Sequence, residues 1–270
     1  MKLITWISTF LVLLACAAPG TARTGAPTDA RAAFDHSHAA WTALLKQHVR
    51  GDRFDYAALA RDRAPLERYL RALEAVTPAE HEAWTREQRY AFWIDVYNAY
   101  TVALVVDRHP IASIKDVSTL FSQVWDQELV PLKPLFPAAK GARLTLNDVE
   151  HRILRPVFAD ARVHAAVNCA SEGCPPLRAE AFVAERLDAQ LDEQVRAWLA
   201  DPARNRYDRA EQRVEISKIF DWFTEDFVRD AGSVQAWIAK YAPPAEREWI
   251  ARAKKLAIGY RDYSWKLNGR

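Results

Sequence analysis

The feature that most constrains the fold is a long apolar segment between residues 86 and 108. A capping box at Thr85-Arg86-Glu87-Gln88 predicts the start of a helix there. His109-Pro110 predicts its end, because a residue that precedes proline avoids the helical conformation. Nonpolar side chains from Phe92 to Val106 cover nearly the whole circumference of this helix, which is typical of a helix buried in the middle of a domain.

The same segment is almost long enough to cross a membrane. Asp95 and Asn98 lie inside it, and Arg89 and Asp107 lie near its ends. Polar and charged groups at such positions are costly in a bilayer. We therefore expect a buried central helix, and no transmembrane span in the mature protein.

The rest of the chain mixes helical and strand-like patterns. Apolar residues at a spacing of three and four predict helices from about residue 32, around 66–73, and at 111–117, 147–154, 187–199, 219–227, 234–241 and 246–255. Alternating or short apolar runs predict strands at 125–130, 142–146, 163–167, 213–216 and 256–267. These patterns predict a helix-rich α+β domain with a small, mostly antiparallel sheet.

The N-terminus has the pattern of an export signal. Lys2 precedes an apolar run that is too short for a comfortable span, so we interpret residues 1–22 as a signal peptide. Cleavage after Ala22 is one alternative, and a lipobox that ends at Cys16 and leaves a lipid anchor there is another. An uncleaved anchor is a third. All three predict a protein in the periplasm, associated with the outer membrane, or secreted.

Composition limits the remaining classes. Half of the chain is hydrophobic, with 10 Trp and 11 Phe. About 245 residues after the signal are enough for one core. We therefore expect a flexible tether at 23–31 and a single globular domain at 32–268. A net charge of +2 gives no basic surface for nucleic acid, and 8 Gly without a phosphate loop argue against nucleotide binding. We expect no cofactor and no metal, and the sequence names no partner.

Two cysteines, Cys169 and Cys174, follow the strand predicted at 163–167. In an oxidising compartment the pair can close a disulfide. Alternatively, one thiol is free and acts as a nucleophile. Cys174 precedes two prolines that suit the start of a helix or turn, where the pKa of a thiol falls, so we favour it slightly over Cys169. A metal site of two Cys and two His is disfavoured, because the spacing is not that of a zinc element.

Three residues are candidate bases or orienting groups. His164 shares the polar face of the predicted strand with Asn168, and could accept the thiol proton or be a buried, satisfied histidine. Glu150 and His151 are adjacent on a predicted helix, so they point about 100° apart. Glu150 could close the helix cap, whereas His151 has no such structural role.

The central helix carries a polar stripe of Asp95, Asn98 and Thr101 at a spacing of three. Such a stripe either pins loops to the helix or lines the same cavity as the cysteines. The motif Asp35-His36-Ser37-His38 looks like a metal ligand set, but histidines on an exposed helix face are the simpler interpretation.

Several separated motifs resemble the domain of unknown function family 547. They are Phe92 to Ala99, Ser113 to Asp116, Leu146 to Arg155, Val163 to Arg178, and Tyr263 to Asn268, and together they cover roughly residues 80 to 268. The resemblance implies a shared fold and site location, and no agreed activity. The family usually has Asn where this chain has Asp95. If that position binds a backbone carbonyl, Asp95 must be protonated or must face another partner.

Two functions from different classes remain open. The first is an extracytoplasmic cysteine-dependent hydrolase or acyltransferase. Cys174 or Cys169 would be its nucleophile, and His151 or His164 its base. Asn98 or Asp95 would orient these groups or stabilise an oxyanion, and Glu150 could orient the imidazole ring. The second is a non-catalytic envelope protein that binds a protein or glycan partner, with Cys169–Cys174 as a structural disulfide.

Overall fold

The computed structural model describes residues 32–119 and 122–269. From Phe34 onwards the described residues form one compact unit. The expected signal peptide at 1–22, the alternative lipid anchor at Cys16 and the expected tether at 23–31 lie outside the described residues. They therefore stay predictions.

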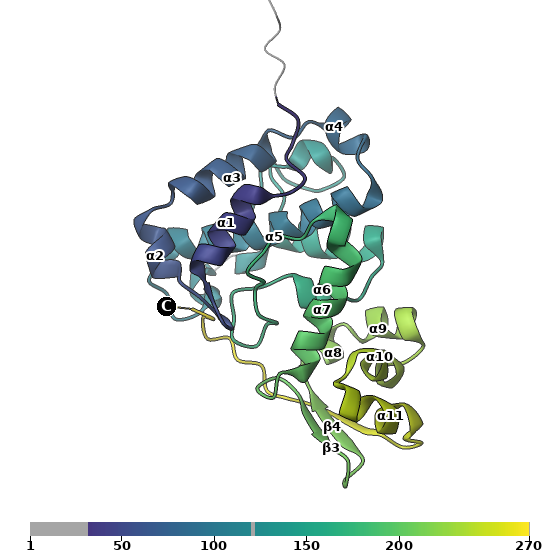
Figure 1. Cartoon of the computed structure of the whole chain (residues 1–270). Helices are drawn as coiled ribbons and strands as arrows, with labels where there is room; N and C mark the ends of the chain where they lie inside the picture. The colour runs from purple at the N-terminus through teal and green to yellow at the C-terminus, as the bar shows by residue number, and fades with distance from the viewer. Residues whose placement is uncertain (1–31, 120–121, 270) are drawn as a thin grey trace, which may run out of the picture. The chain divides into compact units, whose positions relative to one another are not determined.

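Helix α5 (Arg86–Arg108) lies at the centre of the fold, as the sequence predicts (Figure 1). Its capping box is present: Thr85 Oγ1 accepts a hydrogen bond from the Gln88 N–H at 3.2 Å, and Gln88 Oε1 accepts one from the Thr85 N–H at 2.9 Å. Every residue from 90 to 106 is buried. In the part of the chain that the structure describes, no helix has both the length and the apolar character of a membrane span.

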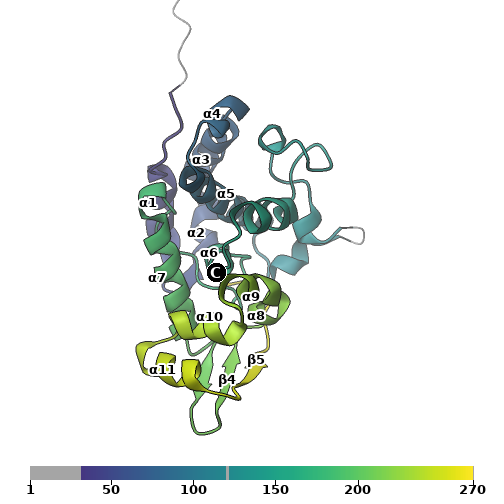
Figure 2. The same ribbon diagram turned by 90° about the vertical axis from the view of Figure 1, so that its right-hand side faces the viewer.

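The other helices surround α5 or form a second layer beside it (Figures 1 and 2). Those before the cysteine loop are α1 (Ala39–His48), α2 (Tyr56–Arg61), α3 (Ala64–Glu74), α4 (Pro78–Glu82), η1 (Ile114–Val117), η2 (Val124–Asp126), η3 (Lys133–Leu135), η4 (Asp148–Phe158) and α6 (Val163–Ala166). Those after it are η5 (Ala184–Arg186), α7 (Leu187–Ala200), α8 (Ile219–Trp222), α9 (Thr224–Ala231), α10 (Val234–Tyr241) and α11 (Pro244–Arg252).

The sheets are small. Strands β1 (Val49–Arg50) and β2 (Arg53–Phe54) form an antiparallel pair. Strand β4 (Arg213–Ile216) lies between β3 (Arg206–Asp208), which is antiparallel to it, and β5 (Ala257–Tyr260), which is parallel. The helix-rich α+β class is therefore confirmed, with a three-stranded sheet that is mixed.

Two hydrophobic clusters build the core. One surrounds α5, and the other gathers Trp198, Phe220, Phe227 and Trp237 from α7 to α10. Helix α6 lies between them, because Val163 and Ala166 pack into the first cluster and Ala165 packs into the second. The cysteine loop begins directly after α6, so it starts where the two clusters meet.

Three elements differ from the predictions. Residues 163–167 are not a strand: 163–166 form α6, and all five residues are buried, so no face of the segment is exposed to solvent. The predicted hairpin at 125–130 and 142–146 is reduced to one bridge between Val130 and Leu144. Helix η4, which has the π form, continues past Pro156 and ends at Phe158.

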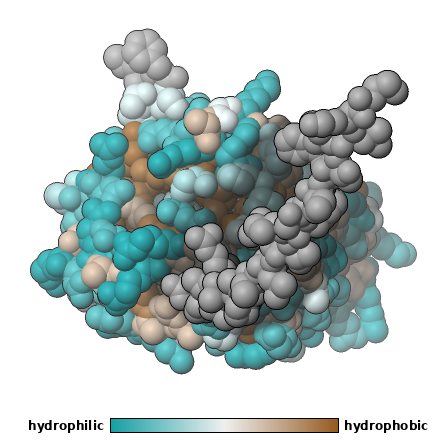
Figure 3. Space-filling model, turned by 90° about the horizontal axis from the view of Figure 1, so that it is seen from above, coloured by the Kyte–Doolittle hydropathy of each residue, from teal (hydrophilic) through white to brown (hydrophobic). Residues whose placement is uncertain are grey.

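The face of the molecule seen from above is largely polar (Figure 3). Hydrophilic residues cover most of the face in Figure 3 and surround a central apolar area. Among the described residues, the large hydrophobic side chains that are exposed are Val157, Trp222, Val228 and Tyr260. Trp222 matters most, because it also lines the cavity at the cysteine loop, described next.

Candidate functional site

A cavity of about 230 Å³ lies at the cysteine loop. Its lining comes from α5, the η2 segment, η4, α6, the cysteine loop, α8 and the C-terminal segment. The lining residues are Tyr97, Gln123, Trp125, Asn147, Glu150, His151, His164, Val167, Cys169, Cys174, Ile219, Trp222, Phe223, Tyr263 and Trp265. Five of the seven candidates named from the sequence therefore share one cavity. The other two, Asn98 and Asp95, do not line it.

Both cysteines are free thiols in this structure. Cys169 is partly exposed, and its Sγ lies 2.9 Å from Ser171 Oγ and 3.0 Å from the Tyr263 hydroxyl. Burial works to raise the pKa of Cys169, but hydrogen bonds from Cys174, Ser171 and Tyr263 outweigh it and lower this pKa to about 7. A large fraction of Cys169 is therefore thiolate at neutral pH.

Cys174 lies deeper, with 4% of its surface exposed. Its Sγ accepts a hydrogen bond from the Cys169 N–H at 3.1 Å and one from the Tyr263 hydroxyl at 3.2 Å. Burial and the neighbouring Cys169 sulfur raise the pKa of Cys174 well above its usual value. The geometry therefore favours Cys169 over Cys174 as the nucleophile, against the slight preference drawn from the two prolines.

Asn168 holds both ends of the cysteine loop. Its Oδ1 accepts the Ala170 N–H at 2.9 Å, and its Nδ2 donates to the Pro175 carbonyl at 2.8 Å. Asn98 fixes Asn168 in turn, because its Oδ1 accepts the Asn168 N–H at 2.8 Å and its Nδ2 donates to the Ala166 carbonyl at 3.0 Å. The polar stripe of α5 thus pins this loop, and Asn98 is a positioning residue.

The loop is tight. Ala170 has a φ of 60°, a left-handed conformation that costs a residue with a Cβ about 1 kcal/mol. An added Cβ at Gly173 would lie 2.8 Å from the Tyr263 ring, so glycine lets Tyr263 approach the sulfurs. Arg204 donates to the Cys174 carbonyl and to the Glu172 carbonyl, both at 2.7 Å. These contacts fix the loop from the protein side and leave the cavity side open.

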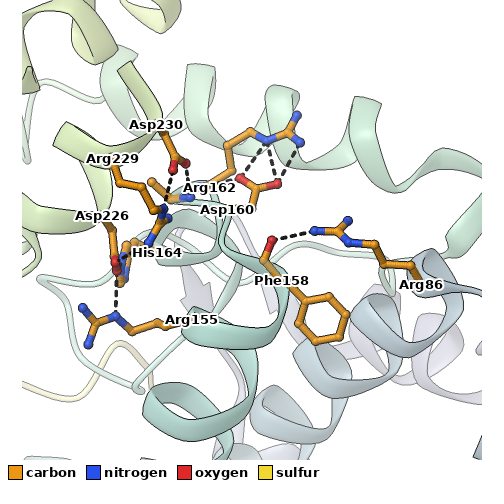
Figure 4. Close-up of polar contacts among 10 residues, drawn as sticks. Arg86, Arg155, Phe158, Asp160, Arg162, His164, Asp226, Arg229 and Asp230 are labelled. Carbon is orange, nitrogen blue, oxygen red and sulfur yellow. Dashed lines mark hydrogen bonds and ion pairs between the residues drawn. The ribbon is translucent and has the colours of Figure 1, made fainter. Parts of the chain in front are cut away.

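His164 is held by a carboxylate. Its Nε2 lies 2.8 Å from Asp226 Oδ2, and its ring stacks on Phe223 with centroids 4.1 Å apart. Asp226 also accepts from Arg155 Nε at 2.6 Å and from Arg229 at 2.8 Å (Figure 4). Burial would raise the pKa of Asp226, but the hydrogen bonds from His164 and Arg155 hold it well below its usual range.

Glu150 and His151 both reach the cavity, although their positions on η4 are adjacent. Glu150 is buried and hydrogen-bonds the Tyr97 hydroxyl, whose pKa burial and this neighbour raise well above its usual value. The cap of η4 is made instead by Thr145, whose Oγ1 accepts the Asp148 N–H at 2.9 Å. His151 is exposed, with its Nδ1 3.3 Å from Arg155.

Asp95 lies away from the cysteines, under α1. Its Oδ1 accepts the Phe182 N–H at 3.3 Å, and its Oδ2 is 3.3 Å from His38 Nδ1. Asp95 therefore faces a donor and not a backbone carbonyl, and it pins a second loop to α5. It does not orient the thiol.

The direct thiol–imidazole pair is not formed. Within residues 32–119 and 122–269, no hydrogen bond joins a histidine ring to Sγ of Cys169 or Cys174, although His151 and His164 line the same cavity. Over the same residues, no group of three or more His, Cys, Asp or Glu side chains could hold a metal ion.

Three residues at the sulfurs were not named as site residues from the sequence: Tyr263, Ser171 and Arg204. Tyr263 lies in the closing motif, and contacts across 94 residues link it to Cys169. That motif was the available signal, because large aromatic side chains such as Tyr263 and Trp265 are expected to pack against the rest of the domain.

The fold and the cavity together define a helix-rich α+β domain with a thiol site at the junction of two cores. Residues 81–199 match the family described as "Protein of unknown function, DUF547", which is the family that the sequence motifs resemble. The match contains α5, η4, α6 and both cysteines but ends before Tyr263. No curated protein and no solved structure matched the chain.

Proposed function

We propose that this protein is a cysteine-dependent hydrolase or acyltransferase that acts outside the cytoplasm, with Cys169 as its nucleophile. The carrying observation is that the Cys169 thiol and His164 line one cavity while Asp226 holds the imidazole. A nucleophile, a base and a third group that orients the base are the parts that covalent acyl transfer needs.

The state of the thiol supports this role. A pKa of about 7 for Cys169 gives the thiolate, which is the reactive form, without a histidine in contact. Cys169 is also the more exposed of the two thiols. An acyl group that enters the cavity would meet Cys169 first.

Proton transfer would fall to the imidazoles. His164 is positioned by Asp226 and stacked on Phe223, so its ring has a fixed orientation. We assign it the role of acid and base, with exposed His151 as the alternative for the leaving group. Catalytic hydrogen bonds are often long without substrate and shorten when it binds, so the open thiol–imidazole contact fits this assignment.

The test is trapping of an acyl-enzyme. The mature protein is incubated with p-nitrophenyl acetate, and the peptide that spans residues 163–178 is analysed by mass spectrometry. We expect acetyl on Cys169, loss of the adduct in Cys169→Ser, and an adduct that persists longer in His164→Gln because deacylation slows. Cys174→Ser is the matched control and should still acylate. No adduct on Cys169 in the folded wild type would contradict the proposal.

The second candidate is a non-catalytic binding protein of the cell envelope. The aromatic lining favours it: Trp222, Tyr263 and Trp265 pack against one another at the cavity, with centroids 4.5 to 5.8 Å apart. Aromatic faces of this kind bind amphipathic ligands. Quenching of tryptophan fluorescence by a glycan, with no acyl-enzyme formed, would favour this function over the first.

A further inference from the structure

We propose that Cys169 and Cys174 form a dithiol pair that reacts with disulfide substrates, a second activity of the same loop. It rests on the proposed function only in that Cys169 is the nucleophile. Both sulfurs contact one hydroxyl, Tyr263, at 3.0 and 3.2 Å, and the Cys169 N–H donates to Cys174 Sγ at 3.1 Å. Acyl transfer needs one nucleophilic sulfur, so in that reaction Cys174 acts only as a hydrogen-bond partner of Cys169.

A reactive dithiol pair needs one accessible thiol that attacks the substrate and a second, less accessible thiol that resolves the mixed disulfide. The two cysteines differ in exposure in this way. Cys169 is partly exposed at the cavity, and Cys174 is 4% exposed behind it. A disulfide that enters the cavity can therefore be attacked by Cys169, and the buried sulfur can attack only what Cys169 holds. A hydrogen bond between the two thiols contributes to the low pKa of Cys169 and the high pKa of Cys174, which supports this division.

The loop keeps the sulfurs within reach of each other. The Cys174 N–H donates to the Ser171 carbonyl at 3.1 Å, which closes a turn, and Ala170 reverses the chain with its φ of 60°. Asn168 bonds the loop at Ala170 and at Pro175, so both cysteines stay on the same side.

The reaction balances without another reagent. The Cys169 thiolate attacks one sulfur of a substrate R–S–S–R, forms a mixed disulfide and releases RS⁻. Cys174 then gives its proton to this thiolate and attacks the Cys169 sulfur, which releases the second RS⁻ and forms Cys169–Cys174. The protein loses two electrons and the substrate gains two.

The test uses the reduced, full-length protein with oxidised glutathione. The peptide 163–178 is read by mass spectrometry after the remaining thiols are blocked, so Cys16 does not affect the result. We expect the wild-type peptide to lose two hydrogens, with no glutathione attached. Cys174→Ser should keep glutathione on Cys169, because nothing resolves the mixed disulfide. Cys174→Ala is a second variant that lacks the resolving thiol and should give the same result. A circular dichroism melt confirms that it is folded.

The outcomes separate the two proposals. A wild-type peptide that keeps glutathione on Cys169 beside a free Cys174 would overturn the dithiol pair and leave the nucleophile standing. A Cys169 that reacts with neither glutathione nor an ester would overturn both. An acyl-enzyme without a bridge would overturn only the pair.

A second substrate identifies the source of the disulfide. Reduction of insulin by the dithiol form, which dithiothreitol in the assay regenerates, is followed as turbidity from the released chain. A rate above that of dithiothreitol alone indicates a protein disulfide. Reaction with oxidised glutathione but not with insulin indicates a small-molecule disulfide as the substrate. In the Cys174→Ser variant the rate of insulin reduction should fall at least about tenfold, because only an external thiol can resolve the mixed disulfide on Cys169. A wild-type rate equal to that of Cys174→Ser would overturn the pair.

Discussion

Asp95 is a buried carboxyl group without a full charge partner. Burial raises its pKa well above the usual value, against the hydrogen bonds from Phe182 and Trp41. Burial also lowers the pKa of His38 to about 4, and the His38 Nδ1 lies 2.7 Å from the Tyr69 hydroxyl. Burial therefore disfavours the charged form of both groups. His38 is 2% exposed, so the interpretation of an exposed histidine was wrong for this residue.

Asp95→Asn should stabilise the protein, and increasingly so as pH rises. A carboxyl whose folded pKa is raised binds a proton in the native state that the unfolded state has released, so wild-type stability falls with pH above about 4. Asparagine keeps the acceptor for the Phe182 N–H and cannot ionise. Urea unfolding at pH 5 and pH 8 measures the difference, with exposed Asp52→Asn as control. An equal effect at both pH values would contradict the assignment.

For single residues, the sequence predicted which reactive side chains form the site better than it predicted the contacts that these side chains make. Cys169, Cys174, His151, His164 and Glu150 were named because their side chains are reactive, and one cavity contains all five. The partners that set the pKa of Cys169 could not be predicted, because Tyr263 reaches it from another part of the chain. The depth of Cys174 could not be predicted either, because burial depends on packing from several elements.

Among the elements, α5 was predicted to the residue because its caps and its composition agree. Helix α6 was predicted as a strand, because Val163 and Val167 alternate with smaller residues. The segment is buried on all sides between two cores, so alternation carries no information about its faces. Local pattern failed where tertiary packing decided the conformation.

Asp226 joins three elements: its own helix α9, α6 through His164, and η4 through Arg155. Asp226→Asn leaves these donors without a charged partner and should cost about 3 kcal/mol of unfolding free energy at pH 7. Because the folded pKa is lowered, this stabilisation is complete above about pH 4 and is lost as pH falls below it.

Chemical unfolding of wild type and Asp226→Asn at pH 7 and pH 3 measures the stabilisation by the Asp226 charge. The difference in unfolding free energy between the two proteins should be smaller at pH 3. The control is Asp221→Asn on α8, an exposed residue whose partner is Lys218, and it should cost less than about 1 kcal/mol. A gap of the same size at both pH values would contradict the role of the charge.

On the scale of the whole described fold, the C-terminal segment completes the site. Lys266 pairs with Ser113, and Leu267 pairs with Ser171, so this segment crosses from β5 to the cysteine loop. It places Tyr263 at both sulfurs and Trp265 at the cavity. The site is therefore made by the chain's last elements as much as by the segment that matches the family.

The central claim is that Cys169 is a thiolate near neutral pH because of its neighbours. The rate of its alkylation by iodoacetamide as a function of pH, read on the peptide 163–178, tests this most directly. We expect half-maximal reactivity near pH 7 in the wild type and in Tyr260→Phe. In Tyr263→Phe the midpoint should rise by about 1 unit, because a hydrogen bond to a charged group contributes about 1.5 kcal/mol. A wild-type midpoint near that of free cysteine, about 8.5, or one unchanged in Tyr263→Phe, would contradict the claim.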